Sequence, residues 1–418
     1  MRLSNMAENL IGSEIIKLAG EVNQKLAAGH QIYNYTIGDF DPKIFPIPHS
    51  LNKLIQAAYA QGHTNYPPAT GIADLRQAVS EWVFTQQQLN YSSDEVLIAG
   101  GARPLIYAIY RTILDQGDKV IFPVPSWNNN HYCHLTSAQQ IWVETSPETN
   151  FMPTLALLQP HLPHANLLAL CSPLNPTGTV FQKAELTRIC EAVWHENQRR
   201  GADAKPLYIM YDQIYSGLLF NDLQHYDPVS LCPQLRPYVI FVDGLSKAFA
   251  ATGIRVGWTF ADKRIIAKMQ SILGHIGAWS PKAEQVATAQ YLRQTKDISL
   301  YLQNFKANIF ARLNAIYQGF QSLKNEGFAV DAIQPQAAIY LTIFINIKGK
   351  ISSSGELIAT TTQATAYLLN QAGLAVVPFS AFGAAADSCW YRLAVGTCRV
   401  EDIPAMLAKL KAALLLLR

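Results

Sequence analysis

One lysine and one arginine stand out in residues 242–258, which read VDGLSKAFAATGIRVGW and otherwise consist mainly of small and apolar residues. Lys247 follows an apolar run that stops at Asp243, and Arg255 comes eight residues after the lysine. A lysine in such a setting is either a surface residue that extends its amine into water or an amine whose lowered pKa makes it a nucleophile. Arg255 is expected to open the next strand, where its guanidinium could clamp a phosphate through two parallel hydrogen bonds.

A second apolar run ends in a pattern that suits an anion. The residues EVLIA are followed by Gly100, Gly101 and Ala102, and a helix is predicted to begin near Pro104. Free backbone N–H groups and a helix N-terminus would then face one point, which is a common way to bind anions. A tight turn that simply needs glycine is the alternative. No GxGxxG or GxxxxGK[ST] motif occurs in the chain, so a dinucleotide site or a P-loop is not supported.

Two more apolar runs end beside polar side chains. NLLALCS leads into PLNPTG, whose two prolines and glycine predict a rigid turn that holds Asn175 in one orientation. PLYIMYD ends at Asp212, and Tyr215 follows three residues later. Asp212 is either the N-cap of a helix or a carboxylate that pairs with a buried cation, and the phenol of Tyr215 could donate a hydrogen bond to an anionic oxygen.

The elements that position these residues follow from the hydrophobic pattern. Between about residues 93 and 300, short apolar runs alternate with helical patterns, which predicts an α/β domain with a mostly parallel sheet covered by helices on both faces. Ligands bind outside the carboxyl ends of the strands in such sheets, so the four strand ends are expected to share one crevice. Together they offer an amine, an acid, hydrogen-bond donors and a phosphate cradle, which is the set that pyridoxal 5'-phosphate requires.

A second, smaller unit is predicted after about residue 310. There the run AIYLTIFINI, a helical TTQATAYLLNQAG and two short strands indicate an α+β fold, joined by an N-terminal helix at 12–28. We expect an N-terminal segment at 1–50 that contributes to this unit, a large cofactor-binding α/β domain at 51–310 and a C-terminal α+β domain at 311–418. The leucine-rich C-terminus predicts a docked helix, because Lys409 and Lys411 interrupt it.

Composition excludes several classes of protein. The 418 residues are 49% hydrophobic and 15% charged, so a large core can form, and the net charge of +3 is too small to indicate a nucleic-acid surface. The six cysteines show no CxxC pair and no zinc-like spacing, so we expect free thiols and no metal site. No signal peptide and no membrane-spanning run is evident in the sequence, which makes a cytoplasmic location the expectation.

From about residue 12 to the C-terminus, the motifs and their order resemble those of the class I aminotransferases of the aspartate aminotransferase superfamily, which are fold type I pyridoxal-phosphate enzymes. The resemblance implies that Lys247 in GLSK forms the Schiff base with the cofactor and that Arg255 in GIRVGW binds its phosphate. Asp212 would pair with the ring nitrogen, and Tyr215 and Asn175 would hydrogen-bond the ring oxygen.

The resemblance also implies further cofactor contacts. Gly101, Ala102 and Ser246 would contact the phosphate. Trp127 in PVPSW would stack on the ring, and its alternative is an ordinary core tryptophan. Tyr66 in TNYPPATGIADLR would reach the phosphate of a neighbouring subunit, which implies a homodimer with shared active sites.

Substrate contacts are implied in the same way. Arg392 in YRLAVG would grip the α-carboxylate of an amino acid, and Gly38 in YTIGDF would lie over the substrate. Cis peptide bonds are implied before Pro125 and Pro176. The implied substrate-binding set is Gly38, Trp127, Asn175 and Arg392.

The chain departs from the family pattern at several positions. Gln213 replaces the glutamate of the usual DExY, and Gly244 replaces a frequent serine three residues before the lysine. Phe379 follows Pro378 where the family usually has proline-glycine before SAFG. GGARPL replaces a GGKQAL-like run whose lysine recognises a distal carboxylate in some members, so Ala102 stands at that position and Arg103 beside it. Because Arg103 could equally be a solvated residue at a helix start, dicarboxylate specificity stays open.

The implied activity is that of an aminotransferase that moves the amino group of an L-amino acid to a 2-oxo acid, with 2-oxoglutarate as the expected acceptor. The reaction would proceed by ping-pong kinetics through an internal aldimine on Lys247, which would then act as general base and acid while Asp212 stabilises the ring. Two alternatives stay open. One is another reaction of the same cofactor on an α-amino acid, as in a β-lyase, a decarboxylase or an ACC-synthase-like enzyme, and the other is a non-catalytic regulator that binds pyridoxal phosphate.

Overall fold

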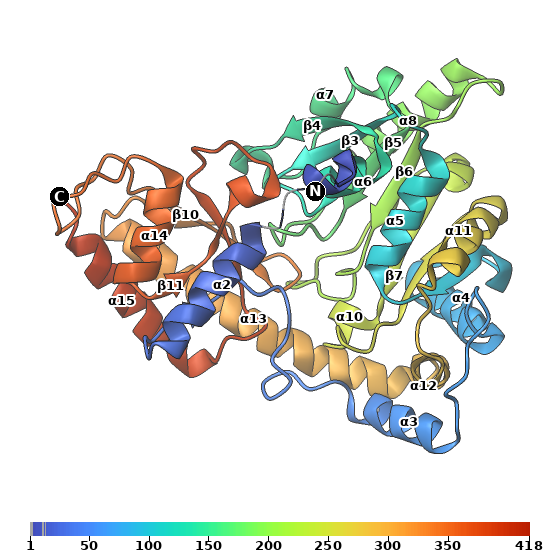
Figure 1. Cartoon of the computed structure of the whole chain (residues 1–418), viewed down its shortest axis with the longest axis horizontal. Coiled ribbons are helices and arrows are strands. Elements are labelled where there is room, and N and C mark those ends of the chain that lie inside the picture. Colours follow the sequence, from blue (N-terminus) through green and yellow to red (C-terminus); the bar gives the residue numbers. More distant parts are fainter. Residues whose placement is uncertain (1–2, 11, 13) are drawn as a thin grey trace.

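The computed structural model describes residues 3–10, 12 and 14–418, and its larger part is built around a seven-stranded sheet (Figure 1). The strands of this sheet are Val96–Ala99 (β2), Lys119–Val124 (β3), Gln139–Glu144 (β4), Leu167–Cys171 (β5), Tyr208–Asp212 (β6), Val239–Gly244 (β7) and Gly257–Phe260 (β8). They lie in the order β2-β8-β7-β6-β5-β3-β4. Only β8 runs antiparallel to its neighbours, so the prediction of a mostly parallel sheet is confirmed.

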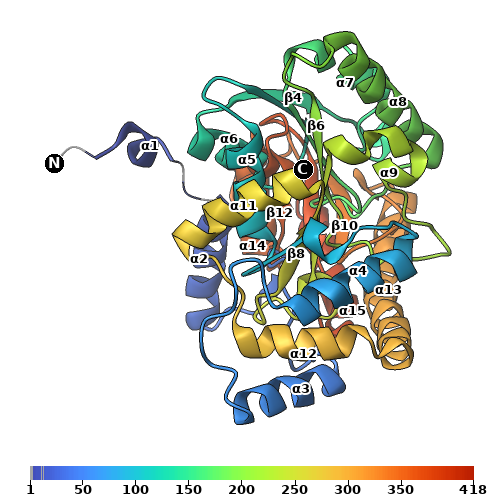
Figure 2. The same ribbon diagram turned by 90° about the vertical axis from the view of Figure 1, so that its right-hand side faces the viewer.

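Both faces of the sheet are buried. In β7, Val239 and Phe241 belong to the apolar cluster on one face, whereas Ile240 and Val242 belong to the cluster on the other. Such a strand needs a continuous apolar run, which YVIFV provides. Helices cover both faces of the sheet (Figure 2), and they are shared between the two clusters. They include Ala102–Ile113 (α5) and Lys263–Ile276 (α11) on the face of Ile240, and Ala73–Gln87 (α4), Lys183–Arg200 (α8) and Lys282–Leu292 (α12) on the face of Val239.

The smaller part contains a four-stranded antiparallel sheet with helices packed against it. Its strands are Val330–Ala332 (β9), Tyr340–Ile345 (β10), Val377–Pro378 (β12) and Trp390–Ala394 (β13), in the order β12-β13-β10-β9. Its helices are Thr295–Asn325 (α13), Thr361–Gln371 (α14) and Ile403–Leu415 (α15). Together the two parts confirm the predicted fold class, a large α/β unit with a smaller α+β unit.

The N-terminal segment packs against this smaller part. Tyr33–Asn34 (β1) pairs in parallel with Leu374–Ala375 (β11), and the ring of Phe40 lies 5.4 Å from that of Phe305. The 31-residue helix α13 begins beside α12 and ends in the smaller part, so it runs through residue 310 (Figure 1). The remaining helices are Asn5–Glu8 (α1), Glu14–Ala27 (α2), His49–Ala60 (α3), Asn129–Thr136 (α6), Leu155–Leu158 (α7), Pro228–Leu231 (α9) and Leu245–Ala248 (α10).

The C-terminal helix α15 is docked, as predicted. It buries Ile403, Met406 and Leu410 in the apolar cluster of the smaller part. Across the described residues, none of the helices combines the length and apolar character that crossing a bilayer demands. All six cysteines are free thiols.

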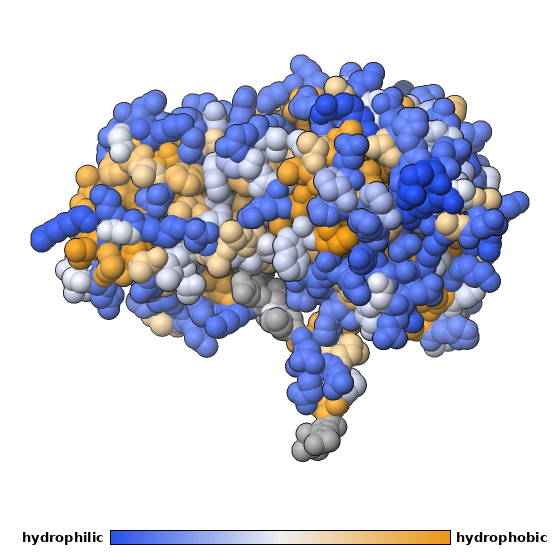
Figure 3. All heavy atoms as spheres, turned by 90° about the horizontal axis from the view of Figure 1, so that it is seen from above, coloured by the Kyte–Doolittle hydropathy of each residue, from blue (hydrophilic) through white to orange (hydrophobic). Residues whose placement is uncertain are grey.

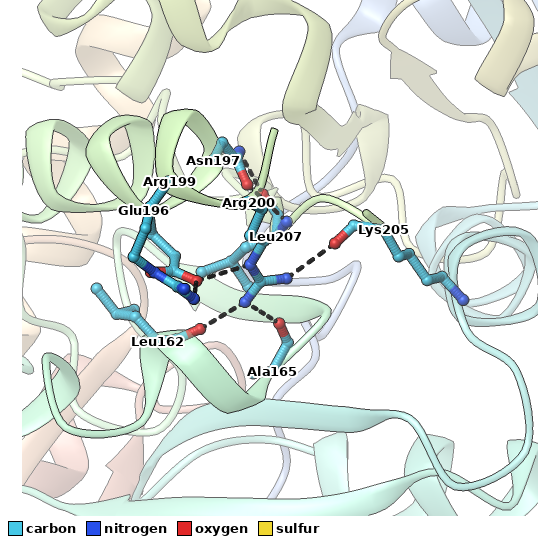
Figure 4. Close-up of polar contacts among 8 residues, drawn as sticks. All are labelled: Leu162, Ala165, Glu196, Asn197, Arg199, Arg200, Lys205 and Leu207. Atoms are coloured by element: carbon cyan, nitrogen blue, oxygen red, sulfur yellow. Dashed lines mark hydrogen bonds and ion pairs between the residues drawn. The ribbon is translucent and has the colours of Figure 1, made fainter. Parts of the chain in front are cut away.

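A buried polar cluster holds the end of α8 against the starts of β5 and β6 (Figure 4). Asn197 accepts a hydrogen bond from the N–H of Leu207 (2.7 Å) and donates one to its carbonyl oxygen (3.0 Å). Arg200 is paired with the carboxylate of Glu196 at 2.8 Å. Its guanidinium also donates to three main-chain oxygens, those of Leu162, Ala165 and Lys205. These bonds fix the strands whose far ends carry cavity residues.

We expect Arg200→Met to lower the free energy of unfolding by about 3 kcal/mol, because it leaves three main-chain oxygens and a buried carboxylate short of a donor. Arg199→Met is the matched control, since Arg199 pairs with the same Glu196 but is 63% exposed. The control should lose at most about 1 kcal/mol. Guanidinium unfolding of both variants measures this, and equal losses would contradict the role given to Arg200.

Candidate active site

A cavity of about 610 Å³ lies at the carboxyl ends of β3, β5 and β6. The strand order reverses between β3 and β5, which is where open α/β sheets bind ligands. Figure 3 shows the surface of the molecule from above. Hydrophilic residues cover much of this surface, and hydrophobic residues gather toward the C-terminal part on the left. The cavity brings together eleven residues singled out in the sequence, namely Gly38, Ala102, Arg103, Trp127, Asn175, Asp212, Tyr215, Ser246, Lys247, Arg255 and Arg392.

Lys247 projects into this cavity from the short helix α10. Its Nζ donates a hydrogen bond to the carbonyl oxygen of Gly38 (2.6 Å). Burial lowers the pKa of Lys247 to about 8, and the charges of Arg392 and Arg103 act in the same direction. About half of the amine is therefore neutral near pH 8, and the neutral form is the one a nucleophile needs. This placement rules out the surface alternative.

Asp212 ends β6 and faces the cavity. Burial raises the pKa of Asp212 to about 6, while the N–H of Ile214, 3.0 Å from Oδ1, and the charge of Lys247 act in the opposite direction. A cation placed against the carboxylate would stabilise its charged form. Asp212 does not cap a long helix, so the N-cap alternative is wrong.

Gly101 and Arg255 form an anion cradle at the start of α5. Arg255 donates to the carbonyl oxygens of Gly100 (2.8 Å) and Thr252 (2.7 Å). A Cβ added at Gly101 would collide with the Arg255 guanidinium, and Gly101 has a φ of 96°. Glycine is therefore required for the guanidinium to lie beside the N–H groups of the helix.

Two predicted boundaries shift slightly around this cradle. The helix begins at Ala102, two residues before the predicted Pro104. Arg255 does not open β8 as expected, because it lies in the preceding turn with a left-handed φ of 60°. That turn aims the side chain back toward the start of α5 instead of placing it in the sheet.

Arg392 is buried on β13, 2% exposed, and crosses into the cavity wall. Its guanidinium donates to the oxygen of Thr36 (2.6 Å) and to Oδ1 of Asn175 (3.2 Å). Its Nε has no hydrogen-bond partner within the described part of the chain. The two terminal nitrogens of the guanidinium each keep a second N–H, and Arg392 lines the cavity, so it can still bind a carboxylate there.

Two cis peptide bonds flank Asn175 in its turn. The peptide bonds before Pro125 and Pro176 are cis, and so is the one before Pro173, which the sequence did not indicate. The amide oxygen of Asn175 points at Arg392, which leaves the amide NH₂ as its donor. Asn175 therefore links the large part to the arginine of the smaller part.

Trp127 and Arg103 lie together in the cavity wall. The Cζ atom of Arg103 lies 4.7 Å from the ring centroid of Trp127, which is a cation–π contact. Trp127 is only partly buried and lines the cavity, so the alternative of a core tryptophan is wrong.

Two predicted residues lie outside the cavity lining. Gly101 supports the cradle from behind, as described above. Tyr66 is 81% exposed, and its ring centroid lies 5.1 Å from that of Trp279. Its hydroxyl is therefore available to a neighbouring molecule.

Sequence reasoning missed the two aromatic rings that contact Arg392. Tyr340 and Phe382 place their rings on the guanidinium of Arg392, each centroid 4.9 Å from Cζ. Phe379, which stands where the family usually has glycine, lies in the core beside this region. Its side chain is fully buried and packs against Phe151. The only signal in the sequence was the position of Tyr340 at the start of a strongly apolar strand.

Gln213 occupies the core below the site. It is fully buried, donates to Oδ2 of Asp243 (3.3 Å) and contacts Nε2 of His225 (3.2 Å). The replacement of the family's glutamate therefore points away from the cavity and leaves Asp212 and Tyr215 in place.

The donor set fits pyridoxal 5'-phosphate. The cradle at Gly101 suits a phosphate, the amine of Lys247 suits an aldehyde, and the carboxylate of Asp212 suits a protonated ring nitrogen. The guanidinium of Arg392 suits the carboxylate of an amino acid. Each group has the charge that its partner needs.

Comparison with known proteins agrees with this fit. The family model "Aminotransferase class I and II" matches residues 32–410. An aspartate aminotransferase of Geobacillus stearothermophilus is 28% identical over 92% of this chain and 92% of its own length. One from Bacillus sp. (strain YM-2) is 26% identical over 91% of this chain and 92% of its own length.

Solved structures support the same fold. The aspartate aminotransferase from Rhizobium meliloti has a TM-score of 0.89 at 24% identity and covers 100% of both chains. The Thermus thermophilus enzyme solved with maleate has a TM-score of 0.86 at 25% identity, covering 99% of this chain and 100% of its own. The expected family, fold and cofactor are thereby confirmed, and the chain belongs to the pyridoxal-phosphate-dependent aminotransferases of class I and II.

Proposed function

We propose that this aminotransferase takes its amino group from aspartate and delivers it to 2-oxoglutarate. The supporting observation is that two arginines line one cavity, and both lower the pKa of Lys247. Arg392 suits the carboxylate next to the amino group, and Arg103 suits a second carboxylate at the far end of a dicarboxylic substrate. Several relatives are named aspartate aminotransferases, which supports the same choice.

The proposed cofactor contacts follow the geometry. Lys247 would hold the aldehyde carbon, Asp212 the ring nitrogen, and Tyr215 with Asn175 the ring oxygen. Trp127 would stack on the ring. The proposed phosphate contacts are Gly101, Ala102, Ser246, Arg255 and the partner subunit's Tyr66. When bound, pyridoxal phosphate supplies an electron-withdrawing ring that stabilises negative charge at the substrate Cα.

The chain itself supplies orientation and proton transfer. Arg392 holds the α-carboxylate, and the carbonyl of Gly38 holds the Lys247 amine at 2.6 Å. With a pKa of about 8, Lys247 can remove a proton from Cα and later return one. Because amino acid and oxo acid would use the same Arg392 in turn, ping-pong kinetics are expected.

Arg103→Ala tests the choice of substrate. We expect kcat/KM for aspartate to fall about tenfold or more, because a charge-assisted contact to the distal carboxylate is lost. Turnover of alanine, which lacks that carboxylate, should change less than about twofold. Arg111→Ala is the matched control, since Arg111 is an exposed arginine of the same helix outside the cavity. An unchanged ratio of aspartate to alanine turnover would exclude Arg103 as the determinant.

We also propose a homodimer whose active sites are shared. Tyr66 is exposed and outside the cavity of its own chain, and Leu3, Met6 and Leu10 expose apolar surface on the segment around α1, which extends from the body (Figure 2). Burying such groups against a second copy would be favourable.

Light scattering should accordingly give about twice 46.3 kDa. Tyr66→Phe should raise the Kd for pyridoxal phosphate about tenfold, because a hydrogen bond to a charged phosphate is lost. Shared active sites would be contradicted by a monomer, or by a dimer in which Tyr66→Phe leaves the affinity for pyridoxal phosphate unchanged.

The domain division at 1–50, 51–310 and 311–418 is also a proposal. Its support is that β1 of the N-terminal segment pairs with β11 of the C-terminal part, and that α13 carries the chain from one part to the other. A cytoplasmic location is proposed as well, since a reducing compartment suits six free cysteines.

A further inference from the structure

Tyr340 lies in the cavity wall between three groups that the proposed function uses. Its side chain is 2% exposed, and its hydroxyl oxygen lies 2.6 Å from that of Tyr215. Its ring centroid lies 4.9 Å from Cζ of Arg392. A Cβ added at Gly38 would lie 2.8 Å from the Tyr340 hydroxyl oxygen, so the segment over the cavity also rests on this side chain.

The two hydroxyl groups constrain each other. Each carries one hydrogen, and burial raises the pKa of both phenols, so both keep that hydrogen at neutral pH. Only one of them can donate within the pair. If Tyr215 is to donate to the ring oxygen of the cofactor, its own oxygen must accept the hydrogen of Tyr340.

The ring of Tyr340 acts on a different group. The rings of Tyr340 and Phe382 both lie against the Arg392 guanidinium, each centroid 4.9 Å from Cζ. Aromatic faces attract a planar cation and restrict the orientation of its plane. The plane of the guanidinium decides where its remaining N–H groups point, and therefore where a carboxylate can bind.

The backbone around Tyr340 is held from the large part. The N–H of Ala337 donates to the oxygen of Gly178 (2.9 Å), and that of Ala338 donates to the oxygen of Leu218 (2.8 Å). Ala338 has a left-handed φ of 62°, which is unfavourable for alanine and needs such external support. Tyr340 is thus fixed relative to the turn that carries Asn175.

We propose that Tyr340 is a positioning residue with two separable roles: its hydroxyl orients that of Tyr215, and its ring orients the guanidinium of Arg392. This inference rests on the proposed function, in which Tyr215 contacts the cofactor and Arg392 binds the substrate carboxylate. Removing the hydroxyl alone should disturb the cofactor, whereas removing the ring should also disturb carboxylate binding.

Two variants of the loaded enzyme separate these roles. Tyr340→Phe keeps the ring, so we expect kcat to fall about tenfold with KM for aspartate within about twofold. The pH midpoint of the bound cofactor's absorbance should shift by about half a unit, because the hydrogen bond to the ring oxygen is altered. Tyr340→Leu should in addition raise the Kd for succinate, a dicarboxylate without an amino group, about tenfold.

Tyr367→Phe is the matched control, since it removes a buried phenolic hydrogen bond, to the oxygen of Ala413 (2.8 Å), from the same core but outside the cavity. It should reproduce any loss of stability without the spectral shift. An unshifted pH midpoint in Tyr340→Phe would overturn the hydroxyl role, and equal succinate affinity in both Tyr340 variants would overturn the ring role. If the wild-type enzyme failed to use aspartate, the proposed substrate would be wrong, but the absorbance titration would still decide the hydroxyl role.

Discussion

Lys247→Ala is expected to lower kcat by about 10⁴-fold or more, because one amine provides both the covalent attachment of the cofactor and the proton transfer at Cα. Lys247→Arg should be equally inactive, since a guanidinium stays charged and cannot act as a nucleophile. The measurement is steady-state turnover of aspartate with 2-oxoglutarate, together with the absorbance of the protein-bound cofactor. Lys268→Ala, at an exposed lysine of α11, is the control and should keep wild-type turnover.

Lys247→Ala also has a consequence for the stability of the protein. Folding lowers the pKa of Lys247 from 10.5 to about 8, so between these values the unfolded chain binds a proton that the folded chain does not. The stability of the cofactor-free wild-type protein should therefore gain a contribution as pH rises from about 8 to 10.5. Lys247→Ala protein should lack this contribution in guanidinium unfolding. Full activity with an unchanged pH profile would disprove the assignment of Lys247.

Asp212→Asn is expected to lower kcat by about 10³-fold, because an amide cannot hold a positive charge on the ring nitrogen of the cofactor. The affinity of the cofactor-free protein for pyridoxal phosphate should fall as well. Single-turnover mixing with aspartate, followed by the absorbance of the bound cofactor, measures the chemical step directly.

Asp243→Asn is the matched control for that substitution. Burial raises the pKa of both carboxyls, to about 6 for Asp212 and about 7 for Asp243, but only Asp212 faces the cavity. Asp243 contacts Gln213, whose amide can rotate to keep its hydrogen bond to an asparagine. Turnover of the Asp243 variant should stay within about threefold of wild type. Similar losses in both variants would show that burial, and not the charge beside the cofactor, is what matters.

Much of the site follows from the order of residues along the chain. Gly101, Asn175, Asp212 and Lys247 each stand at the end of an apolar run or a few residues after it, and parallel strands deliver their carboxyl ends to one edge. A pattern of neighbouring residues therefore predicts that distant residues lie at one site, even before the pairing of the strands is known. The apolar runs predicted the covered sheet for the same reason, since only strands buried on both faces read as continuous apolar segments.

Other contacts could not be predicted in this way. Tyr340 meets Tyr215 and Arg392 from another sheet, so no local spacing relates them. The turn around Arg255 was also misplaced, because a left-handed φ at an arginine is set by the guanidinium's contacts to Gly100 and Thr252. Such a conformation has no signature in the sequence near it.

By itself, the sequence determined the cofactor and the family, because the groups that bind pyridoxal phosphate are fixed by chemistry and lie at strand ends that a pattern can locate. Only the tertiary structure decided how Arg392 is held and what state Lys247 and Asp212 are in. The pKa values of about 8 and about 6 arise from burial, and the orientation of Arg392 arises from rings at 340 and 382. Burial and aromatic stacking depend on which distant segments pack together, and that is a property of the folded chain.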